Sequence, residues 1–423
     1  MAPQVTTLGN GLRVISEKMP SLETTSVGVW VNAGARCERP EINGISHLLE
    51  HMAFKGTQLR SARDIAEEIE AVGGHLNAYT SREQTAYFAK ILKDDLPLAI
   101  DILGDILQNP IFDQDELMRE QTVVIQEIGQ AQDTPDDIIF DYFQDIAFPD
   151  QPLGRPVLGT SENVSSFTRH TLDTYMGQHY TPTRMVVSAA GNIDHDQLVA
   201  LTSQTFLGST TTDDNTFEKA KYVGGHLHQP RELEQVHLLL GLNGLSYEDK
   251  DYYALQVFCT LLGGGMSSRL FQKVREERGL AYSIYSFSTS YVDGGLFGIY
   301  AGTSAESTGE LIDTVCNELL DVAENIGDAE TKRARAQLKS GLLMSLESTS
   351  ARSEQLARQL LLFGRPIPNS EIIENIDSTD PTKLSAVACR LLTNGPLTVT
   401  SLGPPSNMPD YEALEKKLQR RCE

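Results

Sequence analysis

Cysteine is scarce and scattered in this sequence. The 423 residues include five cysteines, and no two of them form a Cys-x-x-Cys pair. An odd number of dispersed cysteines supports neither a disulfide framework nor a thiolate metal site. We therefore expect a reducing compartment, and we look to other side chains for any metal ligands.

Long apolar runs are also missing. No stretch of about 18 apolar residues occurs, so the sequence predicts no membrane span. Residues 1–11 show neither the basic-then-apolar order of a secretory signal nor the arginine richness of a transit segment. We expect a cytoplasmic protein; a mature, trimmed protein of the mitochondrial matrix would begin in the same way.

Basic residues are in the minority. Lysine and arginine number 35 against 58 aspartate and glutamate residues, which gives a formal net charge of -23. An acidic surface repels nucleic acid and favours basic ligands, so we expect no nucleic-acid partner. Since no membrane span is predicted, we also expect no membrane partner. With 40% hydrophobic and 22% charged residues the composition is that of a globular protein, and the length allows two or three domains.

The stretch from Gly44 to Phe54 carries the strongest chemical signal. At about 100° per residue, a helix over this stretch places His47, Glu50, His51 and Phe54 on one face. Two histidines four residues apart can share one metal ion, and the glutamate beside them can reach a metal-bound water. The pattern His-x-x-Glu-His is the inverted zinc-protease signature, although a polar helix face with accidental histidines would look the same. The opposite face is apolar and would anchor the helix in a core: Ile45, Leu48, Leu49 and Met52.

A zinc hydrolase needs a third protein ligand and one open coordination position. The predicted helix over residues 115–131 offers two candidates, Glu120 and Glu127, which lie two turns apart on one side of its apolar stripe. A carboxylate that faces the interior is costly unless it is paired or bound to a metal. The spacing leaves two questions open: which glutamate is the ligand, and whether both instead reach solvent at the edge of the stripe.

The two halves of the chain repeat one order of predicted elements. Residues 208–230 begin without periodicity and are interpreted as a linker between residues 1–207 and 231–423. An apolar strand, helices, a strand pair, further helices and a late strand follow one another in both halves. The second half has no histidine or glutamate at the metal positions. We therefore expect an α+β protein of two homologous domains, each a mainly antiparallel sheet with helices packed on one face, and a metal site in the first.

Four segments resemble the mitochondrial-processing-peptidase and pitrilysin family of zinc peptidases, and the resemblance covers essentially the whole chain. They are residues 44–57, 76–83, 263–271 and 274–282. The short two-domain bacterial peptidases and the catalytic β subunit of the processing peptidase are the most similar members. The resemblance implies a metalloendopeptidase that cleaves unfolded peptides or presequence-like segments, with two subunits, most simply a homodimer, enclosing a chamber. A noncatalytic subunit of the same fold is the alternative, and such relatives typically have damaged metal motifs.

The same resemblance implies the metal ligands. In this family a glutamate 76 residues beyond the second histidine completes the site, which selects Glu127 beside His47 and His51. Glu120 matches the supporting carboxylate of the family, and Glu50 matches the general base that takes a proton from the zinc-bound water. We expect one Zn²⁺ per subunit, although the same ligands also take cobalt or manganese.

Arg275 and Tyr282 match a pair that faces the zinc across the chamber in this family. The tyrosine hydroxyl would stabilise the oxyanion, and the arginine would hold carbonyl groups of the substrate backbone. Family architecture suggests that the pair reaches the zinc of a partner subunit. Without the resemblance, these residues would be interpreted as an arginine at a helix end and a half-buried tyrosine in a strand.

Three further features concern the substrate. Asn77 and Ala78 match the edge strand to which a peptide adds as another strand, and the alternative is an ordinary hairpin strand. Phe54 would line an apolar pocket just after the cut, or would be a core aromatic. Asp137 and Asp141 are four residues apart on a predicted helix and match acidic residues that recognise an arginine just before the cut. A solvated acidic face is the alternative for that pair.

Overall fold

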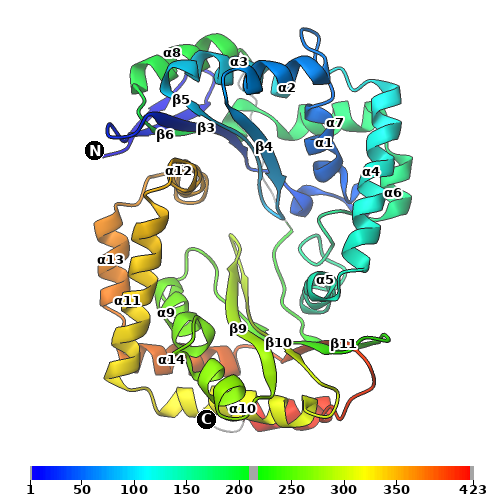
Figure 1. Ribbon diagram of the computed structural model, residues 1–423, viewed down its shortest axis with the longest axis vertical. Coiled ribbons are helices and arrows are strands. Elements are labelled where there is room, and N and C mark those ends of the chain that lie inside the picture. The colour runs from blue at the N-terminus through cyan, green and yellow to red at the C-terminus, as the bar shows by residue number, and fades with distance from the viewer. Residues whose placement is uncertain (1, 209–217, 420–423) are drawn as a thin grey trace. The chain divides into compact units, whose positions relative to one another are not determined.

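The computed structural model describes residues 2–208 and 218–419, and these form two compact units (Figure 1). Each unit is built around one sheet and takes one segment from the other half of the chain. The described residues of the first unit come from the ranges Met1–Gln130, Arg155–Glu218 and Leu343–Pro368, and those of the second from Ala131–Gly154, Lys219–Leu342 and Asn369–Glu423.

The first sheet has six strands in the order β1-β2-β6-β3-β5-β4. Its neighbours β2 (Arg13–Lys18) and β6 (Met185–Gly191) run parallel, and the other pairs are antiparallel. The β-branched residues of β3 (Thr24–Val31) favour a strand, and this strand is buried on both faces. The remaining strands are β1 (Gln4–Thr7), β4 (His75–Thr80) and β5 (Thr85–Leu92).

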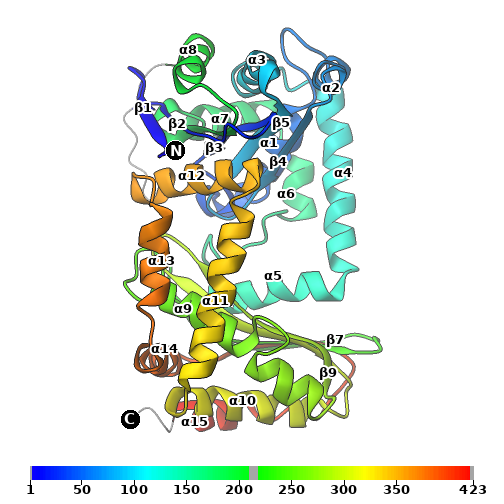
Figure 2. The same ribbon diagram turned by 60° about the vertical axis from the view of Figure 1, so that its left-hand side comes forward.

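Helices cover both faces of the first sheet. On one face, alternate valines of β3 share a core with α3 (Leu96–Gln108) and α8 (His195–Thr205). On the other face, Trp30 of β3 shares a core with Leu360 of α12 (Thr349–Phe363), which contacts β3 and β6 (Figure 2). Successive residues of one strand point to opposite faces, so β3 meets helices from both halves of the chain.

The second sheet repeats the strand order of the first without a counterpart of β1. Its order is β7-β11-β8-β10-β9, and β7 and β11 run parallel. Phe143 of α5 (Pro135–Ala147) packs on one face, and Phe258 of α9 (Tyr252–Gly263) meets Phe297 on the other. The strands are β7 (Gly225–Pro230), β8 (Val236–Asn243), β9 (Ala281–Ser290), β10 (Gly295–Thr303) and β11 (Thr398–Gly403).

The predicted α+β class with two related sheets is confirmed, and the structure adds two features. A single helix from the other half of the chain covers the second face of each sheet, α12 in the first unit and α5 in the second. In addition, residues 225–230 of the expected linker form strand β7, while residues 209–217 lie outside the described part of the chain. Most residues of β7 are exposed, so this edge strand gives no apolar alternation in the sequence.

The other helices complete the two units. No described helix combines the length and the apolar character that a membrane span requires. A capping box between Ser61 and Asp64 starts α2. The bounds are α1 (Ile45–Ala53), α2 (Ala62–Ala71), α4 (Gln114–Gln132), α6 (Ser161–Ser166), α7 (Arg169–His179), α10 (Thr308–Glu324), α11 (Asp328–Ser345), α13 (Asn369–Asp377), α14 (Pro381–Thr393) and α15 (Tyr411–Gln419), with a π-helix at Phe271–Glu276.

Candidate metal centre

The start of α1 is fixed by a buried carboxylate and a glycine. Gly44 has a φ of +97°, and a Cβ atom there would lie 2.7 Å from the carbonyl oxygen of Leu158. The carboxylate of Glu38 accepts hydrogen bonds from the backbone N–H groups of Gly44 and Ser46, each at 2.8 Å. It thereby satisfies donors that a helix N-terminus leaves unpaired. Burial raises the pKa of Glu38 in spite of these hydrogen bonds. Sequence reasoning missed Glu38, because it lies outside the helix that it caps.

One apolar cluster holds α1 against α4. The predicted apolar face of α1 is fully buried, and it packs with Leu117 and Val124 of α4 and with Tyr175 of α7. At roughly 25 cal/mol per Å² of buried apolar surface, such side chains contribute about 1.5–3 kcal/mol each. This shared core turns the opposite face of α1 toward the glutamates of α4.

Three potential ligands converge between these two helices. The distance from His47 Nε2 to Glu127 Oε2 is 3.6 Å, and the distance from His51 Nε2 to the same oxygen is also 3.6 Å. One ligand atom from each of the three residues lies within 4.8 Å of the others. Ligands about 2.1 Å from a tetrahedral zinc ion are about 3.4 Å apart, so the spacing fits a zinc ion.

The protonation of the two histidines also suits a metal. Burial, together with the nearby His51, lowers the pKa of His47 to about 4, so its imidazole is neutral at neutral pH. Nδ1 of His47 is buried and has no hydrogen-bond partner within the described ranges. In contrast, Nδ1 of His51 lies 3.0 Å from Oε2 of Glu120. An ionised carboxylate can only accept, so Nδ1 carries the proton and Nε2 keeps its lone pair for a metal.

Glu120 is ionised in spite of its burial. Its side chain is 7% exposed, and desolvation alone would raise its pKa. Hydrogen bonds from Lys55, at 2.7 Å, and from His51 outweigh this effect, and the pKa of Glu120 lies below its usual value. Of the two glutamates that spacing left open, Glu127 therefore lies at the ligand cluster, and Glu120 lies behind His51.

Glu50 lies on the face of α1 that carries His47 and His51, and its side chain contacts the first sheet. The hydroxyl group of Thr80, at the end of β4, donates a hydrogen bond of 2.6 Å to Oε2 of Glu50. Burial raises the pKa of Glu50, and the hydrogen bond from Thr80 opposes that shift. A raised pKa makes a carboxylate a stronger proton acceptor, which suits a proton-transfer role for Glu50 beside the candidate metal ligands. Thr80 lies in the segment 76–83 that resembles the family, but its contact with Glu50 was not predicted, because local sequence does not show which strand meets the helix.

The predicted substrate residues of the first unit lie close to this face. Asn77 and Ala78 belong to β4, which forms one edge of the first sheet and contacts α1. The Asn77 side chain accepts a hydrogen bond of 2.8 Å from the backbone N–H of Ala78. Phe54 directly follows α1 and is partly buried, with its ring centroid 6.1 Å from that of Tyr87. It therefore packs against the core of the first sheet, directly after the helix that carries the histidines.

The other predicted site residues belong to the second compact unit. The guanidinium carbon of Arg275 lies 4.5 Å from the ring centroid of Tyr282, a cation–π contact. Tyr282 is 75% exposed, so it is not the half-buried strand tyrosine of the alternative interpretation. Asp137 is exposed and Asp141 is partly buried, both on α5.

Comparisons with known proteins agree with the fold. The family model described as "Insulinase (Peptidase family M16)" matches residues 13–161, and that described as "Peptidase M16 inactive domain" matches residues 166–338. A Rickettsia bellii protein described as an uncharacterized zinc protease is 39% identical over 401 residues, covering 95% of this chain and 97% of its own. A protein of Arabidopsis thaliana named "Probable mitochondrial-processing peptidase subunit beta, mitochondrial" is 39% identical over 429 residues, covering 98% and 81% of the two chains.

A solved structure extends the likeness to three dimensions. The crystal structure of a protease from Helicobacter pylori superposes with a TM-score of 0.89, covers 95% of this chain and 99% of its own, and is 22% identical. The candidate ligands lie within residues 13–161, which the first of the two family models matches. The chain belongs to the peptidase M16 family of zinc proteases.

Proposed function

We propose that the protein is a zinc-dependent endopeptidase that binds one Zn²⁺ per subunit through His47, His51 and Glu127. The convergence of these three ligand atoms at zinc-like spacing, with Glu50 on the same helix face, carries the proposal. When bound, the zinc ion supplies Lewis-acid polarisation of the scissile carbonyl and lowers the pKa of a bound water to about 7. Glu50 takes the proton of the attacking water and passes it to the leaving amine.

The substrate is an unfolded peptide or a presequence-like segment. It adds as a further strand to the edge of β4, where main-chain groups of Asn77 and Ala78 pair with it. Phe54 contacts the residue just after the cut. Asp137 and Asp141 bind an arginine just before the cut, which fits the exposed position of Asp137 and the acidic net charge of -23.

The working form is a homodimer in which Arg275 and Tyr282 act on the zinc centre of the partner subunit. The exposure of Tyr282 and its contact with Arg275 support a role for this pair outside the core. Neither a nucleic acid nor a membrane is part of the proposed function.

A zinc assay combined with cleavage of a quenched fluorescent peptide tests the proposal. The purified protein should contain about one zinc per chain and should cleave an arginine-containing peptide in a chelator-sensitive manner. A matched peptide with glutamine in place of the arginine is the control. Zinc-loaded protein that cleaves neither peptide would contradict the proposal and favour a noncatalytic subunit of this family.

Mixing two inactive variants tests the homodimer. In a mixed dimer of Glu50→Gln and Tyr282→Phe subunits, one site combines an intact Glu50 with the intact Tyr282 of the other subunit. If Tyr282 acts in trans, mixing should restore about a quarter of the wild-type activity, because half of the dimers are mixed and each has one complete site. No recovery after demonstrated subunit exchange would show that Tyr282 acts within its own subunit.

A further inference from the structure

Lys55 forms an ion pair with Glu120, the carboxylate that is hydrogen-bonded to the candidate metal ligand His51. Its Nζ atom lies 2.7 Å from Oε1 of Glu120, while the other oxygen of that carboxylate lies 3.0 Å from Nδ1 of His51. One carboxylate therefore bridges an ammonium group and a candidate metal ligand. Lys55 directly follows Phe54, the last residue predicted to lie on the face of the histidines.

The two contacts of Glu120 depend on each other. Its carboxylate has one partner on each oxygen and is almost completely buried. A buried acceptor without a partner is unfavourable, so loss of the ammonium group would favour rotation of the carboxylate toward solvent. Rotation would remove the hydrogen bond that orients the ring of His51, and such hydrogen bonds hold a ligand nitrogen toward its metal.

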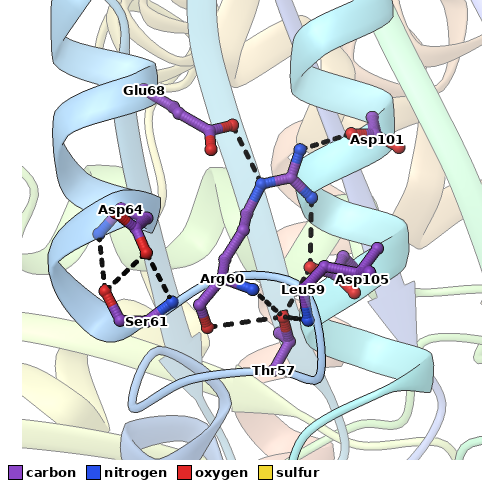
Figure 3. A network of polar contacts seen from close by, with 8 residues as sticks. All are labelled: Thr57, Leu59, Arg60, Ser61, Asp64, Glu68, Asp101 and Asp105. Atoms are coloured by element: carbon purple, nitrogen blue, oxygen red, sulfur yellow. Dashed lines mark hydrogen bonds and ion pairs between the residues drawn. The ribbon is translucent and has the colours of Figure 1, made fainter.

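A polar network around Thr57 and Arg60 holds the turn that follows Lys55 in the chain (Figure 3). The backbone N–H of Lys55 donates to the carbonyl of Met52 at 3.2 Å, and Gly56 turns the chain with a φ of +118°. The backbone N–H of Thr57 donates to the carbonyl of Arg60 at 2.8 Å. The guanidinium of Arg60 then binds carboxylates of the two neighbouring helices α2 and α3: Glu68, Asp101 and Asp105.

This network anchors the turn to two helices of the first unit. The hydroxyl group of Thr57 also donates to Asp105 at 2.6 Å, and Asp105 is buried. The side chain of Lys55 is 30% exposed, and its backbone position is set by this turn, whose loop leads from α1 into α2. A lysine on a fixed turn loses less conformational entropy when it pairs than one on a mobile loop.

We propose that Lys55 is a positioning residue for the metal ligand His51 and acts through Glu120. The inference rests on the proposed zinc function, but it concerns metal binding and the orientation of one imidazole. Removing the ammonium group should weaken zinc binding about 10-fold. This is the lower end of the effects seen when a residue that supports a metal ligand by hydrogen bonding is mutated. An arginine at this position keeps a cation near Glu120 and should restore most of the affinity.

Zinc affinity measured without substrate tests the proposal. Competition with a chelating dye gives the zinc Kd of the wild type and of Lys55→Met, Lys55→Arg and Lys93→Met. Lys93 is the matched control, because its Nζ atom also lies 2.7 Å from a carboxylate, that of Glu23, on the surface of the same unit. The expected result is a Kd about 10-fold higher for Lys55→Met alone. A Kd within about twofold of the wild type, or an equal rise in Lys93→Met, would overturn the proposal.

A double-mutant cycle tests whether Lys55 acts through Glu120. In a Glu120→Ala background, adding Lys55→Met should change the zinc Kd by less than about twofold, because the bridge is already absent. A further 10-fold loss in that background would show that Lys55 acts by another route. If Glu120→Ala does not fold, the comparison of Lys55→Met with Lys55→Arg decides.

The metal-free protein offers an independent readout. Nitrogen-15 spectra of histidine-labelled protein, with His51 assigned through His51→Gln, report which ring nitrogen carries the proton. The wild type should show His51 protonated at Nδ1, and Lys55→Met should show a mixture of tautomers. Unchanged tautomers in Lys55→Met would count against the proposal. Wild-type protein that binds zinc but cleaves no peptide would contradict the proposed function and leave this measurement valid.

Discussion

Replacing Glu38 with alanine should destabilise the first compact unit, because this carboxylate satisfies the start of α1. Its oxygens accept the backbone N–H groups of Gly44 and Ser46 at 2.8 Å and Nδ2 of Asn43 at 2.9 Å. Each buried donor that loses its partner costs about 1–3 kcal/mol. A negative charge at a helix N-terminus contributes about 0.3–1 kcal/mol more.

Part of this loss of stability is offset, because Glu38→Ala also removes the free-energy cost of burying a carboxylate. Burial raises the pKa of Glu38, which shows that its charged form is held at a cost. Alanine removes that cost together with the hydrogen bonds. Taking the two backbone donors as the main loss, we expect the free energy of unfolding to fall by about 2–4 kcal/mol.

The single tryptophan of the chain makes the measurement specific to this unit. Trp30 lies in β3, is 2% exposed, and should report unfolding of the first unit in a urea titration of metal-free protein. The exposed Glu41 is the control, and Glu41→Ala should change stability by no more than about 0.5 kcal/mol. A loss below about 1 kcal/mol for Glu38→Ala would refute the view that this carboxylate fixes α1.

Further predictions concern catalysis, specificity, metal and pH. Glu50→Gln should keep zinc but lower kcat by about 10²–10⁴-fold, and full activity would exclude Glu50 as the base. Asp137→Asn combined with Asp141→Asn should reduce cleavage of arginine-containing peptides about 10-fold, whereas an equal loss on all peptides would contradict arginine recognition. Removal of metal by a chelator should abolish peptide cleavage, and added zinc should restore it; activity that persists in metal-free protein would argue against metal catalysis. Burial and the nearby Arg184 lower the pKa of His179 to about 4. Between pH 6.5 and 4 the unfolded state binds a proton that the folded state does not, so the urea midpoint should fall over this range. The midpoint should fall less in His179→Gln, and parallel curves for the two proteins would contradict the assignment.

The sequence predicted the helix over the His-x-x-Glu-His motif and its two faces, because this information is local. The period of 3.6 residues separates the buried Ile45 and Met52 from His47 and His51, and the structure has that arrangement. The fold class followed from the repeated order of elements. The places of α5 and α12 could not be predicted in this way. An apolar strand such as β3 indicates that both of its faces are buried, but not which helix covers each face.

The supporting residues of the site could not be predicted from local patterns. Glu38, Thr80 and Lys55 reach α1 or its neighbours from three different segments, and each is an ordinary polar residue in its own surroundings. Spacing on α4 gave two glutamates and no choice between them. The family resemblance selected Glu127, and the shared core of α1 and α4 gives the physical reason: it brings Glu127 to both histidines, while Glu120 contacts only one of them, His51.

The exchange of helices between the units has a consequence for synthesis of the chain. The face of the first sheet that includes Trp30 is covered by α12, which ends at Phe363, about 160 residues after the last helix of the first half. At about 5–20 residues per second, the ribosome needs roughly ten to thirty seconds to make that segment. During this interval the first half of the chain lacks α12 and exposes an apolar face of its sheet. The first unit, which carries the candidate metal ligands and Glu50, therefore matures late, after most of the chain has left the ribosome.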